Sequence, residues 1–393
     1  MMDAMARTIS ARRAPLGAVL TAVLAAALGI GLTVMLAACT GPAPTVKPSA
    51  GSGAKTPASA AAARPASRVS LGCSDLVSTS DLGHLFADRM QAVNPAGPQL
   101  DAGSGIPATY YVQSAGGVDC AWSNGKANNG SATIAAMSAT MTVLPNAAVD
   151  WAKYRTTYHL ASNQQEFCSG DTSTAACFLQ ALVNGYWITA DFENVDVRLT
   201  SSTSPVVGQV KPVFAAAKAR LAALAPSGSS AGAAPGASAG LPTACDGYVS
   251  PAEAEAALGT TATIAFSGSG DSWSLPAAAM RRTGVSFCAL SPAGSGDSYG
   301  YVAVLPAGAW AVTDSLTVTN AKRLAVAGLG PGESATAYVN PTTSAVVVDL
   351  VVKGSWIEVD VVKLDATATI PSASVAPATS AIRIAREIVA RVG

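Results

Sequence analysis

The sequence has little charge and almost no histidine. Of its 393 residues, 12% are charged, about half the share of an ordinary soluble domain, and only two are histidines. The 24 basic and 24 acidic residues cancel, so the chain lacks the basic character of a nucleic-acid-binding protein. Two histidines also argue against a metal enzyme rich in histidine ligands. Because half of the residues are hydrophobic and the mean hydropathy is +0.35, the composition resembles that of a membrane protein, and the location of the apolar residues becomes decisive.

An apolar run of bilayer length stands near the N-terminus. Three arginines precede 25 uncharged residues from Ala14 to Ala38, and small residues end the run. This arrangement predicts a secretory signal peptide over residues 1–38. The sequence Leu36-Ala37-Ala38-Cys39 resembles the bacterial lipobox, in which the cysteine receives a lipid and becomes the first mature residue. The resemblance implies lipidation of Cys39, and the alternative is an uncleaved transmembrane anchor, since 25 apolar residues can span a bilayer.

Composition divides the rest of the chain into two segments. Residues 39–70 are rich in Ala, Pro and Ser and have no aromatic side chain, so they cannot bury a core and predict a flexible tether. A second stretch of this kind, residues 226–242, predicts a linker. The folded parts are then residues 71–225 and 243–393, each of ordinary domain size.

These two segments repeat the same landmarks in the same order. The pattern G-x-W-I-x-x-D occurs in both, with an offset of 169 residues between Gly185 and Gly354. Two further pairs have nearly the same offset, Cys120 with Cys288 and Cys73 with Cys245. Near-constant offsets at three landmarks indicate a tandem duplication.

The shared landmarks predict an α+β fold in each segment: a small antiparallel sheet packed with a capped N-terminal helix and a C-terminal helix. Capping boxes at Ser78–Asp81 and Ser250–Glu253 predict the helix starts. Asn184-Gly185 and Lys353-Gly354 separate apolar runs, which predicts a hairpin in each segment. The second hairpin places Val351 opposite Trp356 and Asp349 opposite Glu358. An apolar stripe predicts the last helix, with Ala381, Ala385, Ile388, Val389 and Val392 on it.

The cysteine count agrees with an exported protein. Without the lipidated Cys39, six of the seven cysteines remain, an even number that favours disulfides. The second segment contains only Cys245 and Cys288, which should therefore pair. By equivalence Cys73 pairs with Cys120, and Cys168 is left to pair with Cys177. Zinc or redox chemistry is the competing interpretation, but the sequence has no C-x-x-C motif.

At these residues the chain resembles actinobacterial lipoproteins with tandem domains of unknown function. Those domains have a leading cysteine before a capped helix and a second cysteine in a C-x-W strand. Cys73, Ser78 and Cys120-Ala121-Trp122 carry the likeness in the first segment. The second keeps equivalent cysteines and serine but has Leu290 in place of the tryptophan. The resemblance implies an α+β sandwich of the Mog1/PsbP shape and no assigned reaction; the sensor domains of some actinobacterial Ser/Thr kinases look similar.

Motifs of catalysis are weak in this sequence. The only candidate nucleophile elbow, Gly228–Gly232, lies in the predicted linker without a strand before it or a helix after it. His84 and His159 have no counterpart in the second segment, so we interpret both as surface or packing residues. We therefore expect no enzyme and no cofactor.

The repeated tryptophans are the first candidate site. Strand periodicity assigns Ile188 and Ile357 to the core and puts Trp187, Asp191, Trp356 and Asp360 on the opposite, more polar face. One interpretation is a duplicated aromatic contact patch for a glycan, a peptide or a protein. The other is that a helix or loop covers both tryptophans.

The second candidate is acidic. Asp349, Glu358 and Asp360 share one face, and three carboxylates can coordinate calcium through their oxygens. Equivalent positions in the first segment are Gln180 and Thr189, so such a metal site is not duplicated. The simpler interpretation is a solvated face on which nearby lysines such as Lys363 relieve the repulsion.

Together these features predict a non-enzymatic lipoprotein on the outer face of the cytoplasmic membrane. Its role is binding, sensing or scaffolding, and its expected partners are the membrane, through Cys39, and an envelope protein, a glycan or a small apolar ligand, with no nucleic acid. Alternatives are a carrier of lipids or other apolar ligands and a cell-wall-acting enzyme. A dry cavity between sheet and helix favours the carrier, and a pocket with a titratable pair of perturbed pKa favours the enzyme.

Overall fold

The computed structural model shows an α+β protein with two antiparallel sheets, which confirms the predicted class. Pro57–Gly393 form one compact unit. The predicted signal peptide, Cys39, most of the predicted tether and most of the predicted linker lie outside the described residues. No helix in the described part of the chain is long and apolar enough to cross a membrane. The described residues are 63–86, 88–95, 107–125, 137–170, 174–196, 204–228, 240–266, 274–284, 286–292, 298–315, 321–340, 344–362 and 376–393.

The first segment forms a six-stranded sheet in the order β1-β2-β3-β6-β5-β4. All neighbours in this sheet are antiparallel. The strands are β1 (Gln91–Val93), β2 (Val118–Ser123), β3 (Ser138–Leu144), β4 (Gln164–Gly170), β5 (Thr174–Val183) and β6 (Tyr186–Asp196).

The second segment forms a seven-stranded sheet in the order β10-β11-β12-β13-β9-β8-β7. Read from β7, this is the order of the first sheet with one extra strand, β10, added after β11. The equivalent topology supports the duplication inferred from the spacing of the landmarks. The strands are β7 (Thr263–Phe266), β8 (Ser286–Ser291), β9 (Gly300–Leu305), β10 (Lys322–Arg323), β11 (Ser334–Val339), β12 (Val346–Val352) and β13 (Ser355–Val361).

Both predicted hairpins are present with two-residue turns. Asn184 and Gly185 join β5 to β6, and Lys353 and Gly354 join β12 to β13, each with positive φ at both positions. Such turns match the right-handed twist of the strands they connect, which explains the glycine in each segment. The second turn pairs Asp349 with Glu358, as the sequence predicted.

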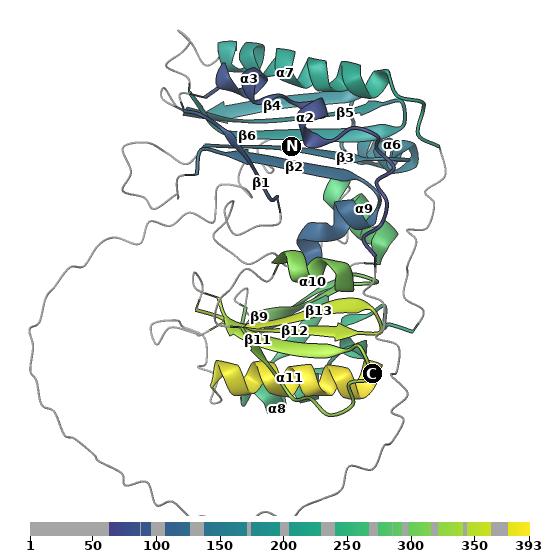
Figure 1. Ribbon diagram of the computed structural model, residues 1–393, viewed down its shortest axis with the longest axis vertical. Helices are drawn as coiled ribbons and strands as arrows, with labels where there is room; N and C mark the ends of the chain where they lie inside the picture. Colours follow the sequence, from purple (N-terminus) through teal and green to yellow (C-terminus); the bar gives the residue numbers. More distant parts are fainter. Residues whose placement is uncertain are drawn as a thin grey trace, which may run out of the picture. The chain divides into compact units, whose positions relative to one another are not determined.

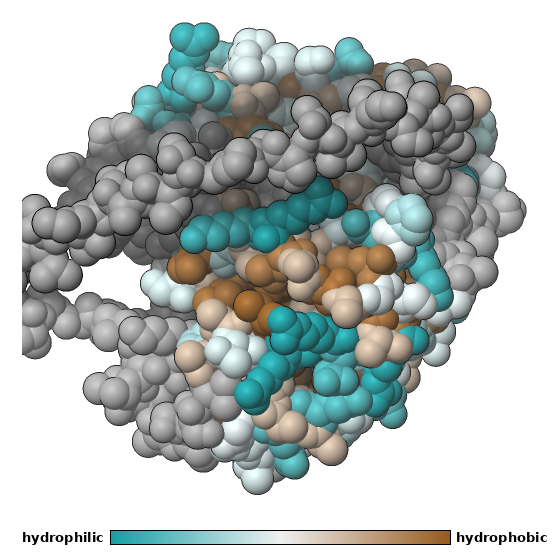
Figure 2. Space-filling model, turned by 60° about the horizontal axis from the view of Figure 1, so that its bottom comes forward, coloured by the Kyte–Doolittle hydropathy of each residue, from teal (hydrophilic) through white to brown (hydrophobic). Residues whose placement is uncertain are grey.

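One face of each sheet is covered by helices of its own segment (Figure 1). On the first sheet this layer contains α2 (Cys73–Leu76), α3 (Thr79–Gly83) and α7 (Ser204–Ala222). On the second it contains η3 (Cys245–Gly247), α8 (Pro251–Leu258) and α11 (Pro377–Val392). Seen from the side on which α8 and α11 lie, hydrophobic residues form an area bordered by hydrophilic ones (Figure 2).

Local sequence signals explain how these covering helices begin and pack. Both capping boxes form: Ser78 Oγ accepts from the backbone N–H of Asp81, and Ser250 Oγ accepts from that of Glu253. The apolar stripe of α11 is buried against the second sheet as predicted, and the first segment buries α7 in the same way. Each segment therefore has its own hydrophobic core between sheet and helices.

The opposite face of each sheet carries Trp187 or Trp356 and is called the tryptophan face below. Shorter helices lie over this face, and each segment supplies an equivalent pair. They are η1 (Pro107–Tyr110) with α5 (Tyr111–Ser114) and α6 (Ala148–Thr157) in the first segment, and α9 (Leu275–Thr283) and α10 (Ala309–Ser315) in the second.

Candidate functional site

Both duplicated tryptophans are completely buried. Trp187 and Trp356 have an exposed fraction of 0%, and Asp360 is also buried, whereas Asp191 is partly exposed. The exposed contact patch predicted for Trp187, Asp191, Trp356 and Asp360 is therefore wrong, and the alternative, that other elements cover the tryptophans, is confirmed. A fully buried ring cannot offer its face to a glycan or peptide.

Each tryptophan is held by the side chain across its hairpin. Trp356 Nε1 donates to Asp349 Oδ1 at 2.7 Å, and Trp187 Nε1 donates to Gln180 Oε1 at 3.1 Å. Asp349 and Gln180 occupy equivalent positions on β12 and β5. A buried indole N–H needs an acceptor, and both segments supply one from the same place.

Residues of the other segment complete each tryptophan cluster. Around Trp187 lie Trp151 and Tyr154 of the first segment, together with Leu275, Ala278 and Ala279 from α9 of the second. This exchange explains why the tryptophans are buried although they lie on the more polar face of their strands.

The second cluster repeats the exchange in the opposite direction. Trp356 contacts Tyr110, from η1 of the first segment, with ring centroids 5.7 Å apart. Tyr110 also meets Trp310 edge to face at 5.6 Å. Since Tyr110 and Ala278 are equivalent by the offset of 168 residues, the two segments contact each other in an approximately symmetric way.

An ion pair strengthens one side of this contact between the segments. Arg282 on α9 donates through Nε to Asp150 on α6 at 3.0 Å, and its Nη1 and Nη2 donate to the carbonyls of Pro145 and Asn146. Both side chains are about one-tenth exposed. The residue of the first segment that is equivalent to Arg282 is Ser114, which cannot form an ion pair. This ion pair is therefore present on one side of the contact only.

The acidic group on β12 and β13 is buried. Glu358 is fully buried, Asp349 and Asp360 nearly so, and Tyr301 Oη donates to Glu358 Oε1 at 2.8 Å. The predicted solvated face is therefore wrong: helices over the tryptophan face exclude water from it. The calcium alternative also finds no support, because no group of three or more potential ligands within the described residues is arranged around a common metal position.

Burial changes the protonation of this acidic group. It raises the pKa of Asp349 to about 7 and the pKa of Asp360 to about 6. The pKa of Glu358 rises well above its usual value, first through burial and then through the neighbouring Asp349 carboxylate. This is the titratable pair that an enzyme would need, but its burial closes it to any substrate. Its Asp349 orients Trp356 by accepting the hydrogen bond from Nε1.

An open groove of about 630 Å³ runs beside α6 in the first segment. Arg155 Nη1 donates to Asn163 Oδ1 at 2.9 Å, and the same oxygen receives a hydrogen bond from Trp151 Nε1. The groove offers donors to a ligand and has no carboxylate in its lining. His159 also lines it, whereas His84 lies at the end of α3. Sequence reasoning missed Arg155 and Asn163, because no motif marks them.

All three predicted disulfides are confirmed. Cys73–Cys120 joins α2 to β2, and Cys245–Cys288 joins η3 to β8 at the equivalent place. The third links Cys168 and Cys177, which lie directly opposite each other on β4 and β5.

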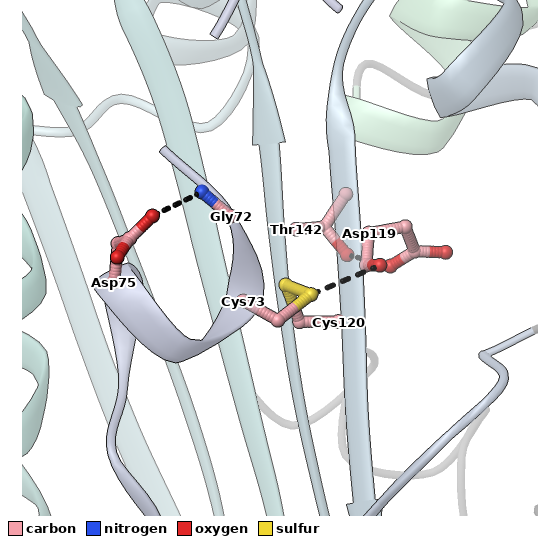
Figure 3. The surroundings of a disulfide bond; sticks show 6 residues. All are labelled: Gly72, Cys73, Asp75, Asp119, Cys120 and Thr142. Carbon is pink, nitrogen blue, oxygen red and sulfur yellow. Dashed lines mark hydrogen bonds between the residues drawn. A yellow bond between two sulfur atoms is a disulfide. The ribbon is translucent and has the colours of Figure 1, made fainter. Parts of the chain in front are cut away.

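Figure 3 shows the first of these bonds with its surroundings. The backbone N–H of Gly72 donates to Asp75 at the start of α2, and Thr142 Oγ1 donates to Asp119 Oδ1 at 2.8 Å. Desolvation raises the pKa of Asp119 to about 6, against the opposing effect of the hydrogen bond from Thr142. The cystine thus fastens a capped helix to a strand in which Asp119, the residue before Cys120, accepts a hydrogen bond from the neighbouring strand.

Comparisons with protein families, with curated proteins and with solved structures give no match.

Proposed function

We propose that this protein is a lipid-anchored extracytoplasmic lipoprotein with a non-enzymatic binding, sensing or scaffolding role at the outer face of the cytoplasmic membrane. The observation that carries the proposal is the pairing of the cysteines. Six of the seven form three disulfides, and the one outside these pairs is Cys39, the residue in the lipobox-like sequence. Disulfides persist in exported proteins, and a lipid on Cys39 accounts for the remaining thiol.

Two features support binding over catalysis. The acid pair with raised pKa values, Asp349 and Glu358, is buried, so it can position a tryptophan but cannot touch a substrate. In contrast, the groove beside α6 is open and offers hydrogen-bond donors. A compact unit whose two segments complete each other's clusters suits a protein that presents a surface.

The anchor is tested by replacing Cys39 with Ala and expressing the chain in a Gram-positive host fed a clickable fatty acid. We expect the native chain to incorporate the label, to begin at Cys39 and to sediment with membranes. Cys39→Ala should lose the label. A matched control is the double variant Cys168→Ala/Cys177→Ala, which removes two cysteines far from the signal and should keep the label. A native chain that is unlabelled and retains residues 1–38 would show a transmembrane anchor and refute the proposal.

A further inference from the structure

The two sheets differ at one edge. In the second sheet, β11 is flanked by β10, with Lys322 opposite Ala337 and Arg323 opposite Thr336. The equivalent strand of the first sheet, β4, is the last in its sheet and pairs only with β5 among the described strands. Its outer edge carries backbone groups equivalent to those that β11 uses to bind β10. One of them, Gln164 O, is the equivalent of Ala335 O, which accepts from the backbone N–H of Leu324; Gln164 O also accepts from Ser162 Oγ at 2.8 Å.

Two phenylalanines lie on the tryptophan face beside this free edge. Phe167 on β4 and Phe178 on β5 are directly opposite each other and are 53% and 36% exposed. The equivalent residues of the second sheet are Tyr338 and Val347, which are 4% and 0% exposed. These two positions are therefore buried in the second sheet, which has the additional strand, and exposed in the first, which does not.

The register of β10 indicates what a partner of β4 would look like. Ala337 and Thr336 correspond to Glu166 and Gln165, so a basic residue placed like Lys322 would stand opposite the Glu166 carboxylate. Glu166 already binds Lys211 of α7 at 2.8 Å, but Lys211 is half exposed and an incoming lysine can share the carboxylate. One residue earlier, the partner's side chain would lie opposite Phe167.

We propose that the free edge of β4 binds an extended segment of another protein as an additional antiparallel strand, with an apolar residue against Phe167 followed by a basic residue against Glu166. Backbone hydrogen bonds supply affinity in such strand addition, and the alternating side chains supply specificity. This inference rests on the proposed binding role and names the class of its partner. Exposed apolar pairs of this kind mark interaction sites when they border an unpaired edge.

The test uses the full chain in detergent and a fluorescein-labelled peptide with the sequence of Asn320–Val326, in which Ala321→Leu supplies the apolar residue. We expect saturable binding by fluorescence anisotropy. Phe167→Ser should weaken it by about tenfold, the loss of roughly one buried apolar contact. A peptide with Lys322→Glu should also bind more weakly, because its glutamate would stand opposite the carboxylate of Glu166. The matched control is Phe266→Ser, since Phe266 is 51% exposed on the edge strand β7 and should not matter.

Three results would overturn the inference. The first is the absence of saturable binding up to about 1 mM peptide, a concentration at which even weak complexes form. The second is equal affinity in Phe167→Ser with an unchanged circular dichroism spectrum. The third is a dimer of the native chain that Phe167→Ser dissociates. The last result would show that a second copy of this chain, and not another protein, binds the edge of β4. Failure here leaves the Cys39 labelling result intact, so it is distinguishable from failure of the proposed function.

Discussion

Asp349 and Glu358 face each other across β12 and β13, and both are buried. Two like charges in this position would be costly, so the raised pKa values follow from the geometry. Trp356 and Tyr301 each donate to one carboxyl, which leaves the pair to accommodate a proton between them. In the first sheet the same positions hold Gln180 and Thr189, so the duplicated fold does not require the acids.

This pair predicts a pH-dependent stability. The pKa of Asp349 is raised from 3.8 to about 7 by burial, so between these values the folded state binds more protons than the unfolded chain. The free energy of unfolding should therefore be highest below pH ~4 for this group and fall as the pH rises to ~7, by at most about 1.4 kcal/mol per pH unit for one proton. Asp349→Asn should reduce this slope and be more stable than the native chain at pH 8. Urea unfolding from pH 4 to 8 measures how the free energy of unfolding depends on pH, with Asp246→Asn at an exposed position as the control. Equal slopes in the native chain and in Asp349→Asn would contradict the prediction.

Tyr110 belongs to the first segment but should stabilise the tryptophan cluster of the second. Tyr110→Ala removes a buried ring that contacts Trp310 and Trp356, and such truncations cost about 3–5 kcal/mol. We expect lower stability in urea and increased acrylamide quenching of tryptophan emission. Phe266→Ala is the control, because an exposed ring should cost less than about 1 kcal/mol. Unchanged quenching in Tyr110→Ala would show that the segments do not complete each other's clusters.

The Arg282–Asp150 pair should be a strong link between the segments. Both side chains are mostly buried, and removal of one partner from a buried pair costs about 3–5 kcal/mol, since a charge is left uncompensated. Arg282→Met should therefore destabilise the chain strongly, and adding Asp150→Asn should recover part of the loss. Arg386→Ala on the exposed side of α11 is the control. Purely additive single losses in this double-mutant cycle would argue against direct coupling.

The long disulfides should stabilise more than the short one. Cys73–Cys120 spans 47 residues and Cys168–Cys177 spans 9. In the chain-entropy treatment these loops correspond to about 4 and about 2.6 kcal/mol. Thermal unfolding of the two paired Cys→Ala variants measures the difference. A larger loss from the short bridge would mean that it acts mainly by tying β4 to β5 in the native sheet.

Local sequence signals predicted much of the fold. Turn residues with positive φ set the register of both hairpins, so Val351 opposite Trp356 and Asp349 opposite Glu358 followed from counting residues. The helix starts at the capping serines and the buried face of α11 could be predicted equally well, because each depends on residues three or four positions away. The duplication then reduced the cysteine pairings to one set, which the structure contains.

The sequence by itself determined which face of a strand each residue occupies, and only the tertiary structure decided whether that face meets water. Alternation put Trp356 and Glu358 on the polar side of β13, but both are buried, and Trp356 packs against Tyr110, which comes from the other segment about 250 residues away. Phe167 shows the converse: it is an apolar residue that stays exposed, on the strand at the edge of its sheet. Periodicity is a property of one strand, whereas burial depends on contacts between elements distant in sequence, and no local pattern encodes those contacts.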